Sequence, residues 1–440
     1  MNSLRTVIKA HNTSNSPGIE VGAKYKPDIT FYDAGISLPD GPITCFQLME
    51  LFVEFKRGST SDPFNEDEDD PFNKSFDTVC ASRGQMALYA TRLQMYQFRT
   101  FVFSVGIFGK VARLFRWDRS GAVVSSPIKY SEKGNRELSE FFYRLNRTNR
   151  AERGLDPTVS DATPEETAAF YQAIKTAVGE GRKKLLENLL NSVGNRAEYP
   201  RKRVDILNLP GTQTSYIVGR SSVTPASPIG RCTRGFVAVE MKTRRLVFLK
   251  DSWRPDISGV RPEPHWYKRL QGARNIAAFS HGSDIGVVVR RRVVATGGTK
   301  PSVQLQRTLT QNYAKKYCQI ADMTGYVHCR IVQCEFYIPL TEFRDSRHLT
   351  EIMYDVLLGE KVFSISKRFA THLSSHSHRR SFREEGSSPR HQHQQYHDHH
   401  SWPGPLNRLR FGARGKLLGR TPVNPHGMSS SFLNALAAIH

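Results

Sequence analysis

The sequence lacks the usual marks of a secreted, disulfide-bonded or membrane-spanning protein. No apolar run is long enough to cross a bilayer, and residues 1–17 lack the charged-then-apolar order of a secretory signal. The six cysteines form no CxxC pair and no regular framework, so their spacing indicates neither structural zinc nor disulfides; they are Cys45, Cys80, Cys232, Cys318, Cys329 and Cys334. We therefore expect an intracellular protein, cytoplasmic or nuclear, with reduced thiols and no membrane partner.

The composition is that of a folded protein with a strong excess of positive charge. The 440 residues are 38% hydrophobic and 10% aromatic, enough for two domains with separate cores. A net charge of +22 allows a nucleic-acid partner, because basic surfaces attract phosphate. Residues 360–440 hold twelve Lys and Arg against four Asp and Glu, so much of the excess lies near the end of the chain. Asp62–Asp70 is acidic and typical of a solvated loop.

Apolar periodicity predicts a multi-domain α+β protein. The N-terminal part alternates as strand, strand, helix, strand, strand, with expected elements at Asp28–Tyr32, Leu48–Phe55, Arg83–Gln97, Thr100–Phe108 and Ala112–Trp117. Residues 164–191 have helical spacing after a Thr cap. A second strand-rich unit then begins near Ser215 and includes a helix over 262–271. The expected organisation is a disordered segment 1–24, an α/β domain 25–150, a helical connector 151–205, a domain 206–358 and a disordered tail 359–440.

A glycine-containing loop in the second unit suggests a nucleotide site. Gly230, Cys232, Gly235 and Val237 follow a G-x-C-x-x-G-x-V pattern, in which glycines let backbone N–H groups approach phosphates. Lys250 lies in the predicted strand VFLK, from which a lysine can reach phosphates, and Glu263 opens a helix that could present its carboxylate to that lysine. Alone the loop could be a simple hairpin turn, but loop, lysine and glutamate in this order favour an ATP site.

Several stretches across about residues 25–358 resemble the fungal-type protein kinase family; they are KPDITFYD, VEFK, RTFVFSVGIFGKVARLFRWDRSGAV, RGLDPTV, IGRCTRGFVAVE, LVFLKDSW and IPLTEF. The resemblance implies a protein kinase-like N-lobe, an antiparallel sheet plus one helix, with ATP and Mg²⁺ as cofactors of intact relatives that phosphorylate protein Ser/Thr. It also places Cys334–Phe336 at the hinge that holds adenine. Cys232 stands where the family has glycine, so we expect weak or no nucleotide binding here.

The catalytic half of a kinase is missing from the sequence as printed. There is no H-R-D-x-x-x-x-N loop and no D-F-G-like metal segment, so no residue is assigned to phosphotransfer. Read one nucleotide later, the codons of Ser388–His397 permit an H-R-D-I-S-x-x-N loop, and those of Pro405–Ala413 permit Leu-Leu-Ile-Asp-Phe-Asp-Leu-Ala-Arg. The two aspartates would fall at the codons of Arg390 and Arg408, eighteen apart. We interpret the tail as out of frame, and its histidine-rich stretch predicts no metal site.

The N-terminal domain carries a second candidate site. Asp28 at a strand start and Glu54 and Lys56 at the end of the next strand resemble a PD-(D/E)xK nuclease core, and Gln85 and Tyr89 on the following helix suit that resemblance. It implies that the two carboxylates hold a divalent metal and that the lysine positions the attacking water. The alternative is a noncatalytic interaction module of the same fold, and the three residues alone do not decide between them. The expected function is thus that of a catalytically inactive kinase-family member, with a metal-dependent nucleic-acid enzyme or a noncatalytic interaction protein as alternatives; the protein substrate stays unknown.

Overall fold

The computed structural model describes residues 7–358 with gaps, which are residues 17, 19–24, 37, 39–43, 66–72, 180–182, 195–198, 209–211, 224, 226, 273–275, 293–298, 319–322, 336–342, 344 and 356. The predicted disordered tail 359–440 lies outside the described residues. No helix among the residues described is both long and apolar enough to cross a membrane.

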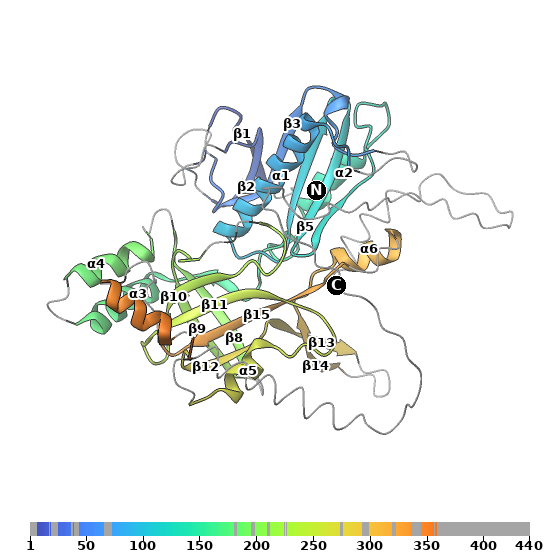
Figure 1. Cartoon of the computed structure of the whole chain (residues 1–440). Helices are drawn as coiled ribbons and strands as arrows, with labels where there is room; N and C mark the ends of the chain where they lie inside the picture. Colours follow the sequence, from blue (N-terminus) through green and yellow to red (C-terminus); the bar gives the residue numbers. More distant parts are fainter. Residues whose placement is uncertain are drawn as a thin grey trace, which may run out of the picture.

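The mixed α+β fold expected from the sequence is confirmed, with two main sheets that occupy separate regions of Figure 1. The first sheet has six strands in sequence order: β1 (Ile8–Asn12), β2 (Ile29–Asp33), β3 (Met49–Lys56), β4 (Val102–Phe108), β5 (Val111–Asp118) and β6 (Gly121–Val124). A short 3-10 turn, η1 (Ser59–Ser61), follows β3. Only β3 and β4 pair in parallel, because the helix α1 (Asp77–Tyr96) crosses between them.

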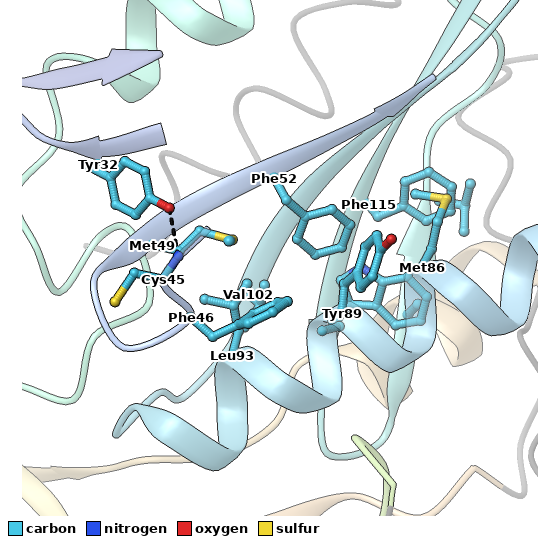
Figure 2. Close-up of a cluster of buried hydrophobic side chains, with 14 of the residues drawn as sticks. Tyr32, Cys45, Phe46, Met49, Phe52, Met86, Tyr89, Leu93, Val102 and Phe115 are labelled. Atoms are coloured by element: carbon cyan, nitrogen blue, oxygen red, sulfur yellow. Dashed lines mark hydrogen bonds between the residues drawn. The ribbon is translucent and has the colours of Figure 1, made fainter. Parts of the chain in front are cut away.

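Each face of the first sheet has its own hydrophobic core. Helix α1 contributes Met86, Tyr89 and Leu93 to the core shown in Figure 2, where the Tyr89 ring meets Phe52 edge-on at 5.4 Å between centroids. On the other face, α2 (Glu137–Leu145) packs Phe141 and Leu145 against β4 and β5. Burial on both faces explains why β4 is apolar at every position except Ser104 rather than alternating.

Residues 1–24 were expected to be disordered, but they include a strand. Ile8–Asn12 forms β1, which pairs antiparallel with β2 over five residues. Only Ile8 in this strand is buried, and the remaining side chains are polar or small. Periodicity is therefore a poor guide to such an edge strand, which pairing with its neighbour stabilises.

Residues 164–191, whose helical spacing predicted a helical connector, form two helices. Helix α3 (Pro164–Val178) ends at Gly179, whose φ of +74° is left-handed, and α4 (Lys183–Ser192) follows. The chain also supplies two strands here, β7 (Val159–Asp161) and β8 (Lys202–Asn208). Both belong to the second sheet, so that sheet draws on residues assigned to the connector.

The second sheet has seven antiparallel strands in the order β12-β15-β11-β10-β9-β8-β7. Its remaining strands are β9 (Thr212–Val218), β10 (Arg234–Glu240), β11 (Leu246–Pro255), β12 (Phe279–Asp284) and β15 (Tyr326–Gln333), with α5 (Glu263–Arg269) after β11. Between β12 and β15 the chain forms a separate hairpin, β13 (Gly286–Arg292) and β14 (Thr299–Leu305), and then α6 (Thr310–Cys318). Residues 346–355 are helical.

Candidate functional site

The lysine and glutamate singled out in the sequence lie together at the centre of the second sheet. Lys250 is on β11 opposite Gly235 of β10, and Glu263 is the first residue of α5. Lys250 Nζ lies 2.6 Å from Glu263 Oε1, and the two side chains are only 21% and 28% exposed. Arg231 Nη2 approaches the other carboxylate oxygen at 3.0 Å. Glu263 therefore fixes the lysine head group and the glycine-containing loop at the same time.

The loop is anchored by its own backbone. Gly230 has a φ of +94° and donates its N–H to the carbonyl of Arg119 at 2.8 Å, which ties the loop to the first domain. The Gly235 N–H donates to Ser221 Oγ at 3.2 Å. A phosphate cradle needs free N–H groups that converge on the ligand. The N–H groups of both glycines are already engaged within the protein.

Cys232 stands in the loop with a backbone that disfavours a side chain. Its φ is +41°, a left-handed value unusual for a residue other than glycine. The thiol is buried and lies 3.3 Å from the carbonyl of Ser227, so it points into the protein. The side chain is thus accommodated inside the loop, at the cost of a strained backbone.

The sheet face around Lys250 is partly filled by the protein itself. Phe248 lies two residues before Lys250 and on the same face, and its ring comes within 2.5 Å of the place that a Cβ on Gly235 would occupy. Gly235 is therefore needed to admit this ring, whatever else it does. Val237 packs under α3 and α4 in a cluster with Ile174 and Leu189. Of the expected hinge, Cys334 is exposed and donates its N–H to Ala278, and Phe336 lies outside the described residues.

The five residues of the nuclease-like constellation come together between β3 and α1. Lys56 Nζ lies 2.8 Å from both Glu54 Oε1 and Gln85 Oε1. Gln85 Nε2 in turn donates to Tyr89 Oη at 2.7 Å. Asp28 lies at the start of β2, where its Oδ2 accepts the Phe55 N–H at 2.7 Å. Glu54, Lys56, Gln85 and Tyr89 thus form one hydrogen-bonded chain, and Asp28 lies close enough for its charge to act on Glu54.

The electrostatics of this group centre on Glu54. Burial raises the pKa of the Glu54 carboxyl, which Lys56 lowers in part and the charge of Asp28 raises again. The pKa of Tyr89 rises to about 12, mainly through burial and also through the charges of Glu54 and Asp28. Glu54 Oε2 is buried without a hydrogen-bond partner. An unpaired buried carboxylate oxygen is costly, and a divalent cation would satisfy it.

The residues present supply two ligands for a divalent metal but not a full set. Glu54 Oε2 and Asp28 offer two carboxylates, and a hard cation such as Mg²⁺ usually keeps several waters as its other ligands. Among the residues described, no three His, Cys, Asp or Glu side chains gather as a dedicated metal site. Asp28 and Glu54 would hold the ion, which would supply charge stabilisation and an activated water when bound.

Sequence reasoning missed a buried ionic network that joins Asp156 to the second sheet. Arg330 Nη2 lies 2.5 Å from Asp156, and Arg330 Nε lies 2.9 Å from Asp251. Asp251 also pairs with Arg234 at 2.5 Å and with His328 at 2.6 Å. Burial alone would raise the pKa of Asp251, but His328, Arg234 and Arg330 hold it well below its usual value. The signal in the sequence for this network was the presence of charged residues at inward-facing positions of otherwise apolar strands.

Comparison with known proteins gives one result. The family model described as "Fungal protein kinase" matches residues 73–368, which is about two thirds of the chain and spans both domains. No curated protein and no solved structure matches the chain. Lys250 and Glu263 both lie within the matched region, and the chain belongs to the fungal protein kinase family.

Proposed function

We propose that this chain is a catalytically inactive member of the fungal protein kinase family whose second domain keeps a weak ATP site. The observation that carries the proposal is the 2.6 Å ion pair between Lys250 and Glu263. In an active kinase such a lysine holds the α- and β-phosphates and the glutamate holds the lysine. An antiparallel sheet with one helix between β11 and β12 supports the same assignment.

Weak binding follows from the loop and its surroundings. The N–H groups of Gly230 and Gly235 are engaged, Cys232 replaces a loop glycine, and Phe248 covers part of the face on which a nucleotide would lie. A ligand must displace these contacts before it gains its own, which lowers its net affinity. Lys250 then acts as the main phosphate contact, with Mg²⁺ bound through the nucleotide rather than through the protein.

Equilibrium binding of Mg²⁺-ATP to the whole chain tests this proposal. We expect weak binding that Lys250→Ala reduces by at least about tenfold, or 1.4 kcal/mol. Lys242→Ala, which removes an exposed lysine on the turn after β10, should bind like the parent. No phosphate should be transferred to a general protein substrate. Equal binding by parent and Lys250→Ala contradicts the ATP site, and phosphorylation that Lys250→Ala abolishes contradicts the inactivity.

The missing catalytic segments have a separate test at the level of the gene. The family match extends to residue 368, so we place the proposed change of frame after that position and before Ser388. A cDNA read across codons 355–430 should show nucleotides that encode both motifs in the shifted frame. The hypothesis is wrong if the codons of Arg390 or Arg408, read in the shifted frame, cannot encode aspartate.

A second candidate function belongs to the first domain. The unpaired Oε2 of Glu54 beside Asp28 and Lys56 favours a metal-dependent nucleic-acid enzyme. Mg²⁺-dependent cleavage of DNA or RNA that Glu54→Ala abolishes would support it, and cleavage that persists in the variant would exclude this site. If the chain neither binds ATP nor cleaves nucleic acid, the noncatalytic interaction protein remains.

A further inference from the structure

A cavity of about 650 Å³ lies between the two domains, on the opposite face of β10 from Lys250. Its floor includes Arg234 and Phe236, which alternate along β10 with Gly235 and Val237. Five segments form its walls: residues 47–48, the end of α1 with the residues after it, residues 150–161, residues 199–202 and residues 219–222. A cavity of this size can enclose a mononucleotide, and ligand sites are common at domain interfaces.

The charge at the mouth of this cavity is positive. Arg150, Lys202 and Arg220 line it together with a single exposed carboxylate, Asp161. Asp161 is already paired with Lys202 and lies 4.0 Å from Arg150. Arg220 has no carboxylate partner among the residues described. An exposed guanidinium without a carboxylate suits a phosphate, which it can bind through two parallel hydrogen bonds.

Aromatic rings accompany the cations. The rings of Tyr96 and Tyr199 lie 5.9 Å apart between centroids, and the Arg220 guanidinium lies 5.7 Å from the Tyr199 ring. Deeper in the cavity, Phe98 and Phe236 stack at 5.4 Å. Planar rings beside a guanidinium offer a stacking surface for a heterocycle and a charge for its phosphate.

The cavity is preformed by buried contacts. Arg234 donates to the Gln97 carbonyl at 3.0 Å and lies 4.1 Å over the Phe98 ring, which holds the floor to the first domain. Asp156 is fixed by Arg330. A rigid site loses little freedom when a ligand binds. From its size, charge and rings, we propose that this interdomain cavity binds a mononucleotide, distinct from the ATP site at Lys250, with Arg220 on the phosphate and Tyr199 against the base.

Ligand binding in this cavity would affect the glycine-containing loop through two serines. Ser221 and Ser222 line the cavity, and both hydroxyls lie within hydrogen-bond distance of the Gly235 carbonyl, at 3.0 and 3.1 Å. Ser221 Oγ also accepts the Gly235 N–H. A ligand that moves residues 219–222 therefore acts directly on the backbone of Gly235.

Calorimetric titration of the whole chain with AMP tests the proposal, in a Lys250→Ala background that removes the kinase-type phosphate contact. AMP should bind, and Arg220→Ala should weaken it about tenfold or more. Tyr199→Ala should weaken AMP and leave inorganic pyrophosphate bound as before. Arg144→Ala, which removes an exposed arginine on α2, is the matched control. A failure of ATP to bind at Lys250 would leave this result unaffected.

A second variant tests the same site in case Arg220→Ala fails to fold. Ser160→Glu places a negative charge on an exposed residue at the rim without altering Arg220, and it should also weaken AMP. Thermal unfolding confirms that each variant is folded before titration. The absence of AMP binding at millimolar concentration, or binding unchanged in both Arg220→Ala and Ser160→Glu, would overturn the proposal.

Discussion

Arginines account for several of the largest side chains buried in this protein, including Arg113, Arg119, Arg153 and Arg330. Most are paired inside: Arg113 lies 2.8 Å from Asp62, and Arg153 lies 3.2 Å from Glu50. The carboxylates that pair with these arginines are already counted in the net charge of +22, so the pairing leaves the excess positive charge to the rest of the molecule. The nucleic-acid partner that this charge allows stays a prediction, because phosphate attraction depends on exposed cations.

Glu54 gives a prediction for pH dependence at the scale of a residue. Burial raises the pKa of this carboxyl above 4.5, so the native protein binds its proton more tightly than the unfolded chain does. The contribution of Glu54 to stability is therefore full at acid pH and is lost as the pH rises through the native pKa. Glu54→Gln keeps the neutral form. We expect the free energy of unfolding of the parent, relative to Glu54→Gln, to fall from about pH 4.5 upward.

Urea unfolding of both proteins at several pH values measures this difference. Addition of Mg²⁺ should stabilise the parent more than Glu54→Gln at neutral pH if the ion binds here, because an ion favours the ionised carboxylate. A difference between the two proteins that does not change with pH would contradict the burial of a charge at Glu54.

At the scale of elements, the start of α3 is specified by a capping box that the sequence already shows. The Thr163 hydroxyl accepts the Glu166 N–H at 3.2 Å, and the Glu166 carboxylate accepts the Thr163 N–H at 3.0 Å. Thr163→Ala should lower the free energy of unfolding by about 1 kcal/mol, and Thr163→Ser should restore most of it. Chemical denaturation measures both, and an equal loss in the serine variant would argue against the cap.

The elements that could be predicted are those whose periodicity reflects burial. The strands β3 and β4 were expected close to their observed positions, and α1 was expected in the right place but begins six residues before Arg83. The strand β8 was missed even though Val204 and Ile206 alternate inward, because it lies in a stretch interpreted as helical connector. The helical spacing over 164–191 does not reveal the break at Gly179, where the left-handed backbone ends α3.

At the scale of the whole molecule, Arg234 joins the two domains. It pairs with Asp251 at 2.5 Å, donates to Gln97 across the interface and lies over Phe98. Arg234→Met should lower the free energy of unfolding by about 3 kcal/mol. The substitution leaves the buried Asp251 carboxylate with one partner fewer and removes the hydrogen bond that the Gln97 carbonyl accepts. The exposed pair of Glu140 and Arg144 is the control, and Arg144→Ala should change stability by about 0.5 kcal/mol or less.

Urea unfolding followed by tryptophan fluorescence measures both variants, since Trp117 and Trp253 are buried in different domains. An Arg234→Met protein as stable as the parent would show that the interface does not depend on this ion pair.

The proposed ATP site was predictable only where its parts are local. The spacing of Lys250 and Glu263 follows from a strand and the helix after it, and the structure brings them within 2.6 Å. The anchoring of Gly230 by Arg119 joins residues 111 apart across two domains. No local pattern encodes such a contact. The contacts that weaken the proposed ATP site are therefore those that the sequence does not predict.

The place of β15 in the second sheet has a consequence for synthesis. β15 lies between β11 and β12 and is the last strand of this sheet to leave the ribosome, more than 70 residues after β11. Until residue 333 has emerged, β11 has an open edge and β12 has no neighbour in the sheet. A nascent chain that pauses in this interval presents unpaired strands, which are the features that recruit chaperones and promote aggregation.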